Sequence, residues 1–260
     1  MPLKVRGLLL DVQGTLVTRG EGGKTVLIGG KRLLQVARSK GIGIRVLTNA
    51  SKGSSSVLSE LVGLGLDLRE GEVITSAELT AAYLRDRIGK ARVWVLGEPE
   101  LAEVLRSYGH EIVEDGPDAV VVGLDKNITY EKLNRALHFL RRGAMLVGCH
   151  ASRRIPGASG ETVSVGPIVK ALEYASEKRA VVIGKPSKII FRAALRDLRL
   201  RAEEVAMVSD ELRSDLAPAK SLGMKTVLTL TGVSSREDVR RLGVEPDLIV
   251  ENVDELADHV

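Results

Sequence analysis

Short apolar runs alternate with amphipathic segments along most of the chain. The runs suit buried strands, and in the segments between them apolar residues recur at three- and four-residue spacing, as on one face of an α-helix. The predicted strands cover residues 8–12, 42–48, 93–96, 119–123, 145–149, 180–184, 205–209, 225–230 and 248–250. The predicted helices include residues 31–39, 55–64, 130–142, 168–178, 189–198 and 216–222. This alternation predicts an α/β fold with a doubly wound, mostly parallel sheet that helices cover on both faces.

Two segments stand apart from the alternation. Residues 151–166 are the least patterned part of the chain, and we expect an exposed loop there. Pro218 comes shortly after Asp215, at the start of an apolar-periodic segment. Proline is tolerated in the first turn of a helix, so we expect a helix to begin just before Pro218.

Composition is that of an ordinary globular protein, with 44% hydrophobic and 28% charged residues in a chain of 260. Aromatic residues make up only 3%, so the core must be aliphatic. No apolar run reaches the roughly 18 residues needed to cross a bilayer, and the first residues lead directly into a strand pattern. The single cysteine, Cys149, excludes an internal disulfide and fits a reducing compartment. We therefore expect a cytoplasmic protein without a membrane partner.

Charge does not indicate a nucleic-acid partner. The net charge is +4, but it comes from Arg-rich helices and a few short pairs of basic residues, and never from a tract interleaved with aromatic residues. A mildly positive field suits an anionic small substrate. Charged residues are abundant, and Gln13 and Gln35 are the only glutamines, a composition that favours a thermophilic source.

Polar side chains follow four of the predicted strands at their carboxyl ends. In doubly wound sheets this is the edge at which ligands bind. Any one of these residues could instead cap a helix or a turn. Their repetition, always at the carboxyl end of a strand, favours a site for phosphate and metal. The residues are Asp11, the pair Thr48 and Asn49, Lys185, and Asp210 with Asp215 five positions later.

These motifs resemble, in order, the four motifs of the haloacid dehalogenase superfamily of phosphohydrolases. The matching segments are residues 11–16, 46–49, 184–186 and 209–215. The resemblance implies a catalytic core at residues 1–76 and 179–260. It also implies an inserted α/β cap at residues 77–178, as in the NagD or 4-nitrophenylphosphatase branch. Residues 148–175 are similar to the subgroup of phospholysine phosphohistidine inorganic pyrophosphate phosphatase.

The resemblance implies a role for each motif residue. Asp11 is the nucleophile that accepts the phosphoryl group, and Lys185 neutralises the charge of the phosphate. The backbone carbonyl of Gln13 joins the carboxylates of Asp11 and Asp210 in holding Mg²⁺. The remaining implied roles are phosphate binding by Thr48, Asn49 and the amide of Gly14, and metal ligation or orientation by Asp215. A homodimer is also implied.

Substrate contacts from the cap are less defined. Basic and polar side chains in the unpatterned segment could reach a substrate, and a closing cap would exclude water. The candidates are Arg153, Arg154, Ser159 and Glu161.

Two residues depart from the family pattern. Gln13 stands where the family carries a carboxylic acid that protonates the leaving group, and general acid catalysis contributes about 10²- to 10⁴-fold. We therefore expect good leaving groups to be favoured: aryl or acyl phosphates, pyrophosphate or phosphoramidates. Ser209 stands where the family has glycine, which removes no ligand. Two alternatives remain open: a catalytically weak phosphate- or metabolite-binding protein, and a phosphotransferase.

Other motifs carry weaker predictions. Gly22-Gly23-Lys24-Thr25 imitates the end of a phosphate-binding P-loop, but position 18 is threonine where that motif requires glycine. Cys149 and His150 could form a metal or nucleophile pair, although a strand end that enters the cap loop explains them better. The other three histidines, His110, His138 and His259, are expected to be structural or exposed.

Overall fold

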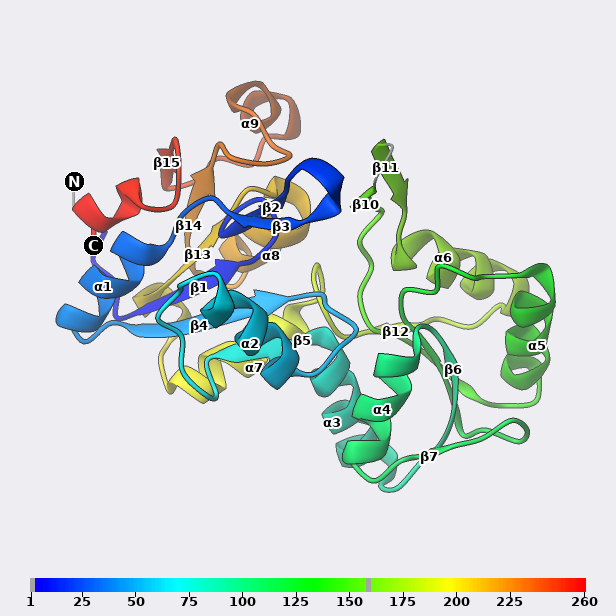
Figure 1. The fold of residues 1–260 in the computed structure, drawn as a ribbon. Helices are drawn as coiled ribbons and strands as arrows, with labels where there is room; N and C mark the ends of the chain where they lie inside the picture. The colour runs from blue at the N-terminus through cyan, green and yellow to red at the C-terminus, as the bar shows by residue number, and fades with distance from the viewer. Residues whose placement is uncertain (1–2, 158–159) are drawn as a thin grey trace. The chain divides into compact units, whose positions relative to one another are not determined.

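The computed structural model describes residues 3–157 and 160–260 and divides into two compact units (Figure 1). The first unit comprises Met1–Thr48, Ser55–Ile74 and Lys188–Val260. The second comprises Asn49–Ser54 and Thr75–Ser187. The predicted limits of a catalytic core and a substrate-selecting cap stay a prediction, because compactness does not assign those roles.

A six-stranded sheet forms the centre of the first unit, in the order β15-β14-β13-β1-β4-β5. The pairs β1–β4, β1–β13, β13–β14 and β14–β15 are parallel, as predicted. Buried aliphatic side chains fill β1 and β13, in keeping with a sheet covered on both faces. The strands are β1 (Gly7–Asp11), β4 (Gly43–Thr48), β5 (Val73–Thr75), β13 (Val205–Ser209), β14 (Lys225–Thr229) and β15 (Leu248–Val250).

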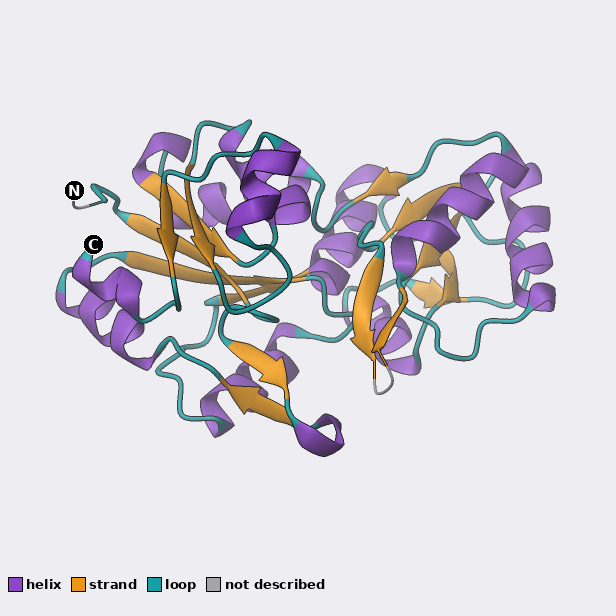
Figure 2. Ribbon diagram, turned by 90° about the horizontal axis from the view of Figure 1, so that it is seen from above, coloured by secondary structure: helices purple, strands orange, loops and turns teal. Residues whose placement is uncertain are grey.

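Helices flank this sheet (Figure 2). In α1 the buried residues Leu33, Leu34 and Ala37 recur at helical spacing, and the helix packs on β4 together with α7. The α-helices are α1 (Lys31–Ser39), α2 (Ser54–Gly63), α7 (Lys188–Leu198), α8 (Ala217–Lys220) and α9 (Arg236–Leu242). The smaller elements are β2 (Val17–Arg19), η1 (Glu21–Gly23), β3 (Thr25–Leu27), η2 (Ala202–Glu204), the π-helical turn η3 (Leu212–Leu216) and η4 (Glu255–Asp258). Pro218 lies in the first turn of α8, as predicted.

The second unit has its own parallel sheet, in the order β12-β9-β8-β6-β7. In its core the rings of Trp94 and Phe139 pack in a T-shaped arrangement, with ring centroids 5.6 Å apart, among aliphatic side chains. The strands are β6 (Arg92–Leu96), β7 (Glu111–Ile112), β8 (Ala119–Val122), β9 (Met145–Gly148) and β12 (Val181–Val182). The helices are α3 (Ser76–Ile88), α4 (Pro99–Ser107), α5 (Tyr130–Arg141) and α6 (Val165–Ser176). Among the described residues, no helix is both long and apolar enough to span a membrane.

The segment predicted as an exposed loop contains a hairpin. Strands β10 (Arg154–Gly157) and β11 (Gly160–Val163) pair antiparallel, and α6 begins soon after, at Val165. Residues 160–163 are all exposed, so β11 has no buried face and shows no alternation of apolar and polar residues. The prediction of a loop was wrong for these two strands, because β11 is joined to β10 by backbone pairing without the burial that marks a strand in a sequence.

Candidate active site

Asp11 lies at the carboxyl end of β1, near the middle of the first sheet. The preceding leucines of β1 are fully buried, and the Asp11 side chain is only 8% exposed. The register pairs Leu10 with Val208 of β13, and Asp11 with Leu47 of β4. The carboxyl ends of three adjacent strands therefore meet at Asp11, which is the arrangement that the strand-end pattern predicts.

The turn after Asp11 is shaped by Gly14. Its φ of +83° is a conformation that residues with a side chain rarely adopt, and a Cβ on it would lie 2.2 Å from Oδ2 of Asp210. The Gly14 amide donates to the carbonyl of Val17 at 2.7 Å and so closes the turn. The close approach of the Asp210 side chain therefore requires glycine at position 14. Contact between the Gly14 amide and a phosphate stays a prediction.

Asp210 is held between two glycines in the first unit. Its side chain is 3% exposed, and a Cβ on Gly232 would lie 1.8 Å from its Oδ2. The amide of Val233 donates to the same Oδ2 at 2.8 Å, while the amide of Asp210 itself donates to Oγ1 of Thr15 at 3.2 Å. We call Gly14, Gly232 and Val233, which surround this carboxylate, the glycine cradle.

The cradle includes residues that the sequence reasoning missed. Gly232 and Val233 follow β14, and the hydroxyl of Thr231 donates to the carbonyl of Gly14 at 2.6 Å. This contact ties the loop after β14 to the turn after β1. The signal was present in the sequence, because Thr231 and Gly232 also follow a predicted strand at its carboxyl end.

The donor set at these strand ends fits a hard divalent cation. Asp11 and Asp210 are buried carboxylates next to neighbouring strand ends, and Mg²⁺ prefers oxygen ligands and keeps several waters. The described residues include no group of three or more His, Cys, Asp and Glu side chains that could together hold a metal ion. A magnesium site made of two carboxylates, one backbone carbonyl and water does not need a third such side chain. Ligation by the backbone carbonyl of Gln13 stays a prediction.

Asp215 is buried in η3 and receives two hydroxyl hydrogen bonds. Ser209 Oγ donates to its Oδ2 at 2.9 Å, and Ser214 Oγ donates to its Oδ1 at 2.7 Å. A carboxylate that is 1% exposed needs such donors, because burial otherwise costs it the hydrogen bonds of water. Asp215 is therefore held in a defined orientation on the loop that also carries Asp210.

Asn49 and Lys185 lie together in the second unit. The side-chain oxygen of Asn49 accepts from the Lys185 amide at 2.9 Å, and its amide nitrogen donates to the Lys185 carbonyl at 3.2 Å. The same nitrogen donates to Oγ of Ser152 at 3.0 Å. We call the two contacts with the Lys185 backbone the asparagine clamp. The structure thus gives Asn49 a positioning role toward Lys185 that the sequence did not predict, and phosphate binding by its side chain stays a prediction.

The predicted residues divide between the units. Asp11, Gly14, Thr48, Asp210 and Asp215 belong to the first unit, with Thr48 as the last residue of β4. Asn49 and Lys185, which is 4% exposed, belong to the second. Of the proposed substrate contacts, Arg154 and Glu161 form an ion pair across the β10–β11 hairpin, and Arg153 is exposed. Ser159 lies outside the described residues.

Cys149 and His150 follow β9 and enter the loop toward β10. Burial raises the pKa of the Cys149 thiol to about 12, so this thiol is not a ready nucleophile at neutral pH. Burial, and to a lesser extent the charge of Lys185, lowers the pKa of His150 to about 4. The amide of Ser152 donates to Nδ1 of His150 at 3.3 Å, which requires the neutral ring. These properties agree with the prediction that Cys149 and His150 are the end of a strand with a structural role, and not a metal-binding or nucleophilic pair.

The buried neutral His150 makes stability depend on pH. Its folded pKa of about 4 lies below the unfolded value of 6.5, so the unfolded state binds the proton more readily. We expect about 3 kcal/mol of unfolding free energy to be lost as the pH falls from 6.5 toward 4, at 1.36 kcal/mol per pKa unit. Urea unfolding at several pH values measures this loss of unfolding free energy. His150→Asn keeps an acceptor for Ser152 but does not titrate, and an equally steep loss in this variant would contradict the assignment.

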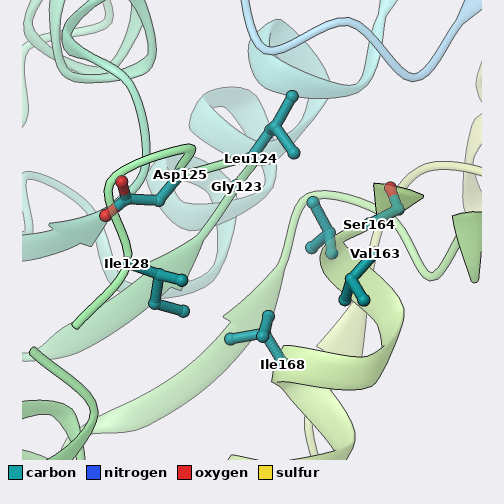
Figure 3. Close-up of a pocket in the computed structure, with 8 residues that line it drawn as sticks. Gly123, Leu124, Asp125, Ile128, Val163, Ser164 and Ile168 are labelled. Carbon is teal, nitrogen blue, oxygen red and sulfur yellow. The ribbon is translucent and has the colours of Figure 1, made fainter. Parts of the chain in front are cut away.

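A small cavity lies in the second unit beyond the carboxyl end of β8 (Figure 3). Its volume is about 60 Å³, and Leu124, Ile128 and Ile168 contribute apolar walls. The buried hydroxyl of Ser164, which also lines it, has no hydrogen-bond partner in the described part of the chain. Small-molecule sites usually occupy about 300–1,000 Å³. The cavity suits a few water molecules, and it is not a candidate active site.

Comparison with known proteins agrees with the geometry. A family model described as haloacid dehalogenase-like hydrolase matches residues 8–111, and a second, HAD-hydrolase-like model matches residues 182–256.

The chain is 30% identical to the sugar-phosphatase AraL of Bacillus subtilis, over 97% of this chain and 92% of AraL. It is 35% identical to human glycerol-3-phosphate phosphatase, over 90% of this chain and 81% of that protein. The crystal structure of 4-nitrophenylphosphatase from Thermotoga maritima superposes with a TM-score of 0.89 at 32% identity, covering 98% of this chain and 97% of that one. The chain therefore belongs to the haloacid dehalogenase superfamily, in its NagD or 4-nitrophenylphosphatase-type branch of phosphatases that act on small phosphorylated molecules.

Proposed function

We propose that this phosphatase is Mg²⁺-dependent and works through a phosphorylated aspartate at position 11. The observation that carries the proposal is the buried Asp11 carboxylate at the end of β1, next to the strand that delivers Asp210 into the glycine cradle. A carboxylate presented in this way can act as a nucleophile, and two such groups with the Gln13 carbonyl would hold Mg²⁺.

The reaction proceeds in two displacements at phosphorus. An oxygen of Asp11 bonds to phosphorus as the bond to the leaving oxygen or nitrogen breaks, and the leaving group departs with the electron pair. A water oxygen then attacks phosphorus, releases inorganic phosphate and regenerates the Asp11 carboxylate. Thr48, Asn49 and the ammonium of Lys185 bind the phosphate oxygens, and the asparagine clamp fixes the base of the lysine side chain. Bound Mg²⁺ would neutralise the charge that builds up on those oxygens.

Gln13 narrows the choice of substrate. A glutamine side chain cannot supply a proton to the departing group, so the substrate must carry a leaving group that departs as an anion or brings its own proton. Aryl phosphates, acyl phosphates, pyrophosphate and phosphoramidates meet this condition better than sugar or glycerol phosphates. The relatives named for sugar phosphate and glycerol 3-phosphate make alkyl phosphates the main competing substrates. The similarity of residues 148–175 to the subgroup that cleaves phospholysine, phosphohistidine and pyrophosphate points to the favoured class.

A substrate series tests this preference. We expect kcat/KM for substituted phenyl phosphates to fall steeply as the pKa of the phenol rises, and alkyl phosphates to be poorer still. Initial rates with Mg²⁺, and with EDTA as the control, give the slope. A slope near zero, with glycerol phosphate cleaved as well as 4-nitrophenyl phosphate, would sink the preference.

The same assays separate the alternatives. A phosphate- or metabolite-binding protein would be inert toward the whole series while still binding phosphate. A phosphotransferase would release a burst of phenol and then speed up when alcohols or sugars are added. As further proposals from sequence alone, we place the enzyme in the cytoplasm of a thermophile and expect a homodimer, which analytical ultracentrifugation would detect.

A further inference from the structure

Ser209 occupies the position at which the family has glycine. Its hydroxyl makes two hydrogen bonds in a fully buried environment. It donates to Oδ2 of Asp215 at 2.9 Å and accepts from the amide of Glu211 at 3.1 Å. The side chain of Ser209 is 0% exposed. Because the Glu211 amide occupies a lone pair of the oxygen, the hydroxyl proton is directed toward Asp215.

The contact spans the base of the loop that carries both acidic residues of the motif. Ser209 ends β13, Asp210 follows it, and Asp215 lies in η3, six positions after Ser209. A main-chain hydrogen bond from Leu216 to Glu211 at 3.2 Å closes the same loop. The serine hydroxyl therefore couples the orientation of Asp215 to the strand end from which Asp210 is delivered.

We propose that Ser209 is a positioning residue for the cation site: through Asp215 it orders the 210–215 loop and so raises the affinity for Mg²⁺. The proposal rests on the proposed function, because it takes the carboxylates at these strand ends as the Mg²⁺ site. Asp215 has a second donor in Ser214, at 2.7 Å from its Oδ1. The Ser209 bond fixes the opposite oxygen, so the two donors together define the plane of the carboxylate.

Ser209→Ala removes the hydroxyl, and Ser176→Ala is a matched control. Ser176 is also a buried serine that donates one hydrogen bond, to the carbonyl of Leu172 at 2.6 Å, and accepts one, from the amide of Lys178 at 3.3 Å. It lies at the end of α6 in the second unit, away from Asp215 in the chain. Both variants lose a buried hydroxyl, but only one of them loses a contact with Asp215.

Titration of the metal-free protein with Mg²⁺ by calorimetry is the readout. Groups that support a metal site from behind its ligands typically contribute about 10- to 100-fold in affinity. We expect Ser209→Ala to raise the Kd for Mg²⁺ by about tenfold, with the kcat for 4-nitrophenyl phosphate largely recovered at saturating Mg²⁺. Ser176→Ala should leave the Kd unchanged. Ser209→Thr, which keeps the hydroxyl, should restore the affinity.

A double-mutant cycle assigns the effect to Asp215. In an Asp215→Ala background, Ser209→Ala should cause no further rise in Kd, because the partner of the hydroxyl has been removed. Circular dichroism establishes that each variant is folded, and Ser209→Gly removes the same hydroxyl should the alanine variant not fold.

The outcomes distinguish this inference from the proposed function. A wild-type protein that neither binds Mg²⁺ nor hydrolyses phosphates with it overturns both. A wild-type protein that does both, while Ser209→Ala and Ser209→Gly bind Mg²⁺ as tightly as Ser176→Ala, overturns the role of Ser209 alone. An effect of Ser209→Ala that is equally large with and without Asp215→Ala would also overturn it.

Discussion

Asp11→Asn is expected to lower kcat/KM for 4-nitrophenyl phosphate by about 10⁴-fold or more, as the loss of a nucleophile does in other covalent enzymes. The asparagine amide has nearly the same shape, so it fits the buried end of β1, but it is a poor nucleophile toward phosphorus. Steady-state rates at saturating Mg²⁺ measure the change.

Asp210→Asn is the matched control for Asp11→Asn. Asp210 is also a buried strand-end carboxylate in the first unit, but the proposal gives it metal binding and no covalent role. Raising the Mg²⁺ concentration should therefore recover part of the activity of Asp210→Asn and none of that of Asp11→Asn. If Mg²⁺ restored the activity of Asp11→Asn, the side chain at position 11 would act only as a metal ligand and not as the nucleophile.

Gln13→Asp is expected to raise kcat/KM for glycerol phosphate by about 10²-fold, the lower part of the range for general acid catalysis. Gln13 is half-buried in the turn after β1, so a carboxylic acid placed there can protonate the departing oxygen. The rate with 4-nitrophenyl phosphate should change by less than tenfold, roughly, because nitrophenolate leaves without a proton. The slope of rate against leaving-group pKa should flatten.

Gln13→Asn is the control that separates the effect of the carboxylic acid in Gln13→Asp from the effect of the shorter side chain. Asparagine has the size of aspartate but no ionisable proton, so it should keep the steep slope of the wild type. If Gln13→Asp and Gln13→Asn gave the same ratio of alkyl to aryl phosphate rates, the missing acid would not explain the substrate preference.

Much of the fold could be predicted because its strands and helices have strong periodic signals. Strand β13 occupies the predicted residues 205–209, and α1 the predicted residues 31–39. These segments bury one face or all of their side chains, and burial is what the apolar pattern records. The β10–β11 hairpin was not predicted, since the described residues of β11 are exposed.

The assignment of strands to sheets also lies beyond a local pattern. Strand β12, which precedes Lys185, pairs with β9 in the second sheet. Its apolar run predicts a strand but contains nothing that selects a partner, because pairing depends on residues far away in the sequence.

The candidate site, like the fold, could be predicted only in part from the sequence. Strand-end polarity located Asp11 and Asp210, because it follows from the order of residues in one segment. The asparagine clamp joins Asn49 to Lys185 across 136 positions, and the cradle joins Gly14 to the loop after β14. Such contacts depend on the tertiary structure, so the sequence indicates the residue types but not their partners. Ser209 was noted as a departure from the family, and only its hydrogen bond to Asp215 suggests a use for it.

Trapping the phosphorylated enzyme tests the central claim most directly. Wild-type protein is mixed with 4-nitrophenyl phosphate and Mg²⁺, quenched in acid within the first turnover and treated with borohydride, which reduces an aspartyl phosphate to homoserine. Tandem mass spectrometry then reads the peptide that contains position 11. The proposed mechanism predicts homoserine at position 11, dependent on both substrate and Mg²⁺ and missing in Asp11→Asn. Full turnover with unmodified Asp11, or with homoserine at another aspartate, would contradict it.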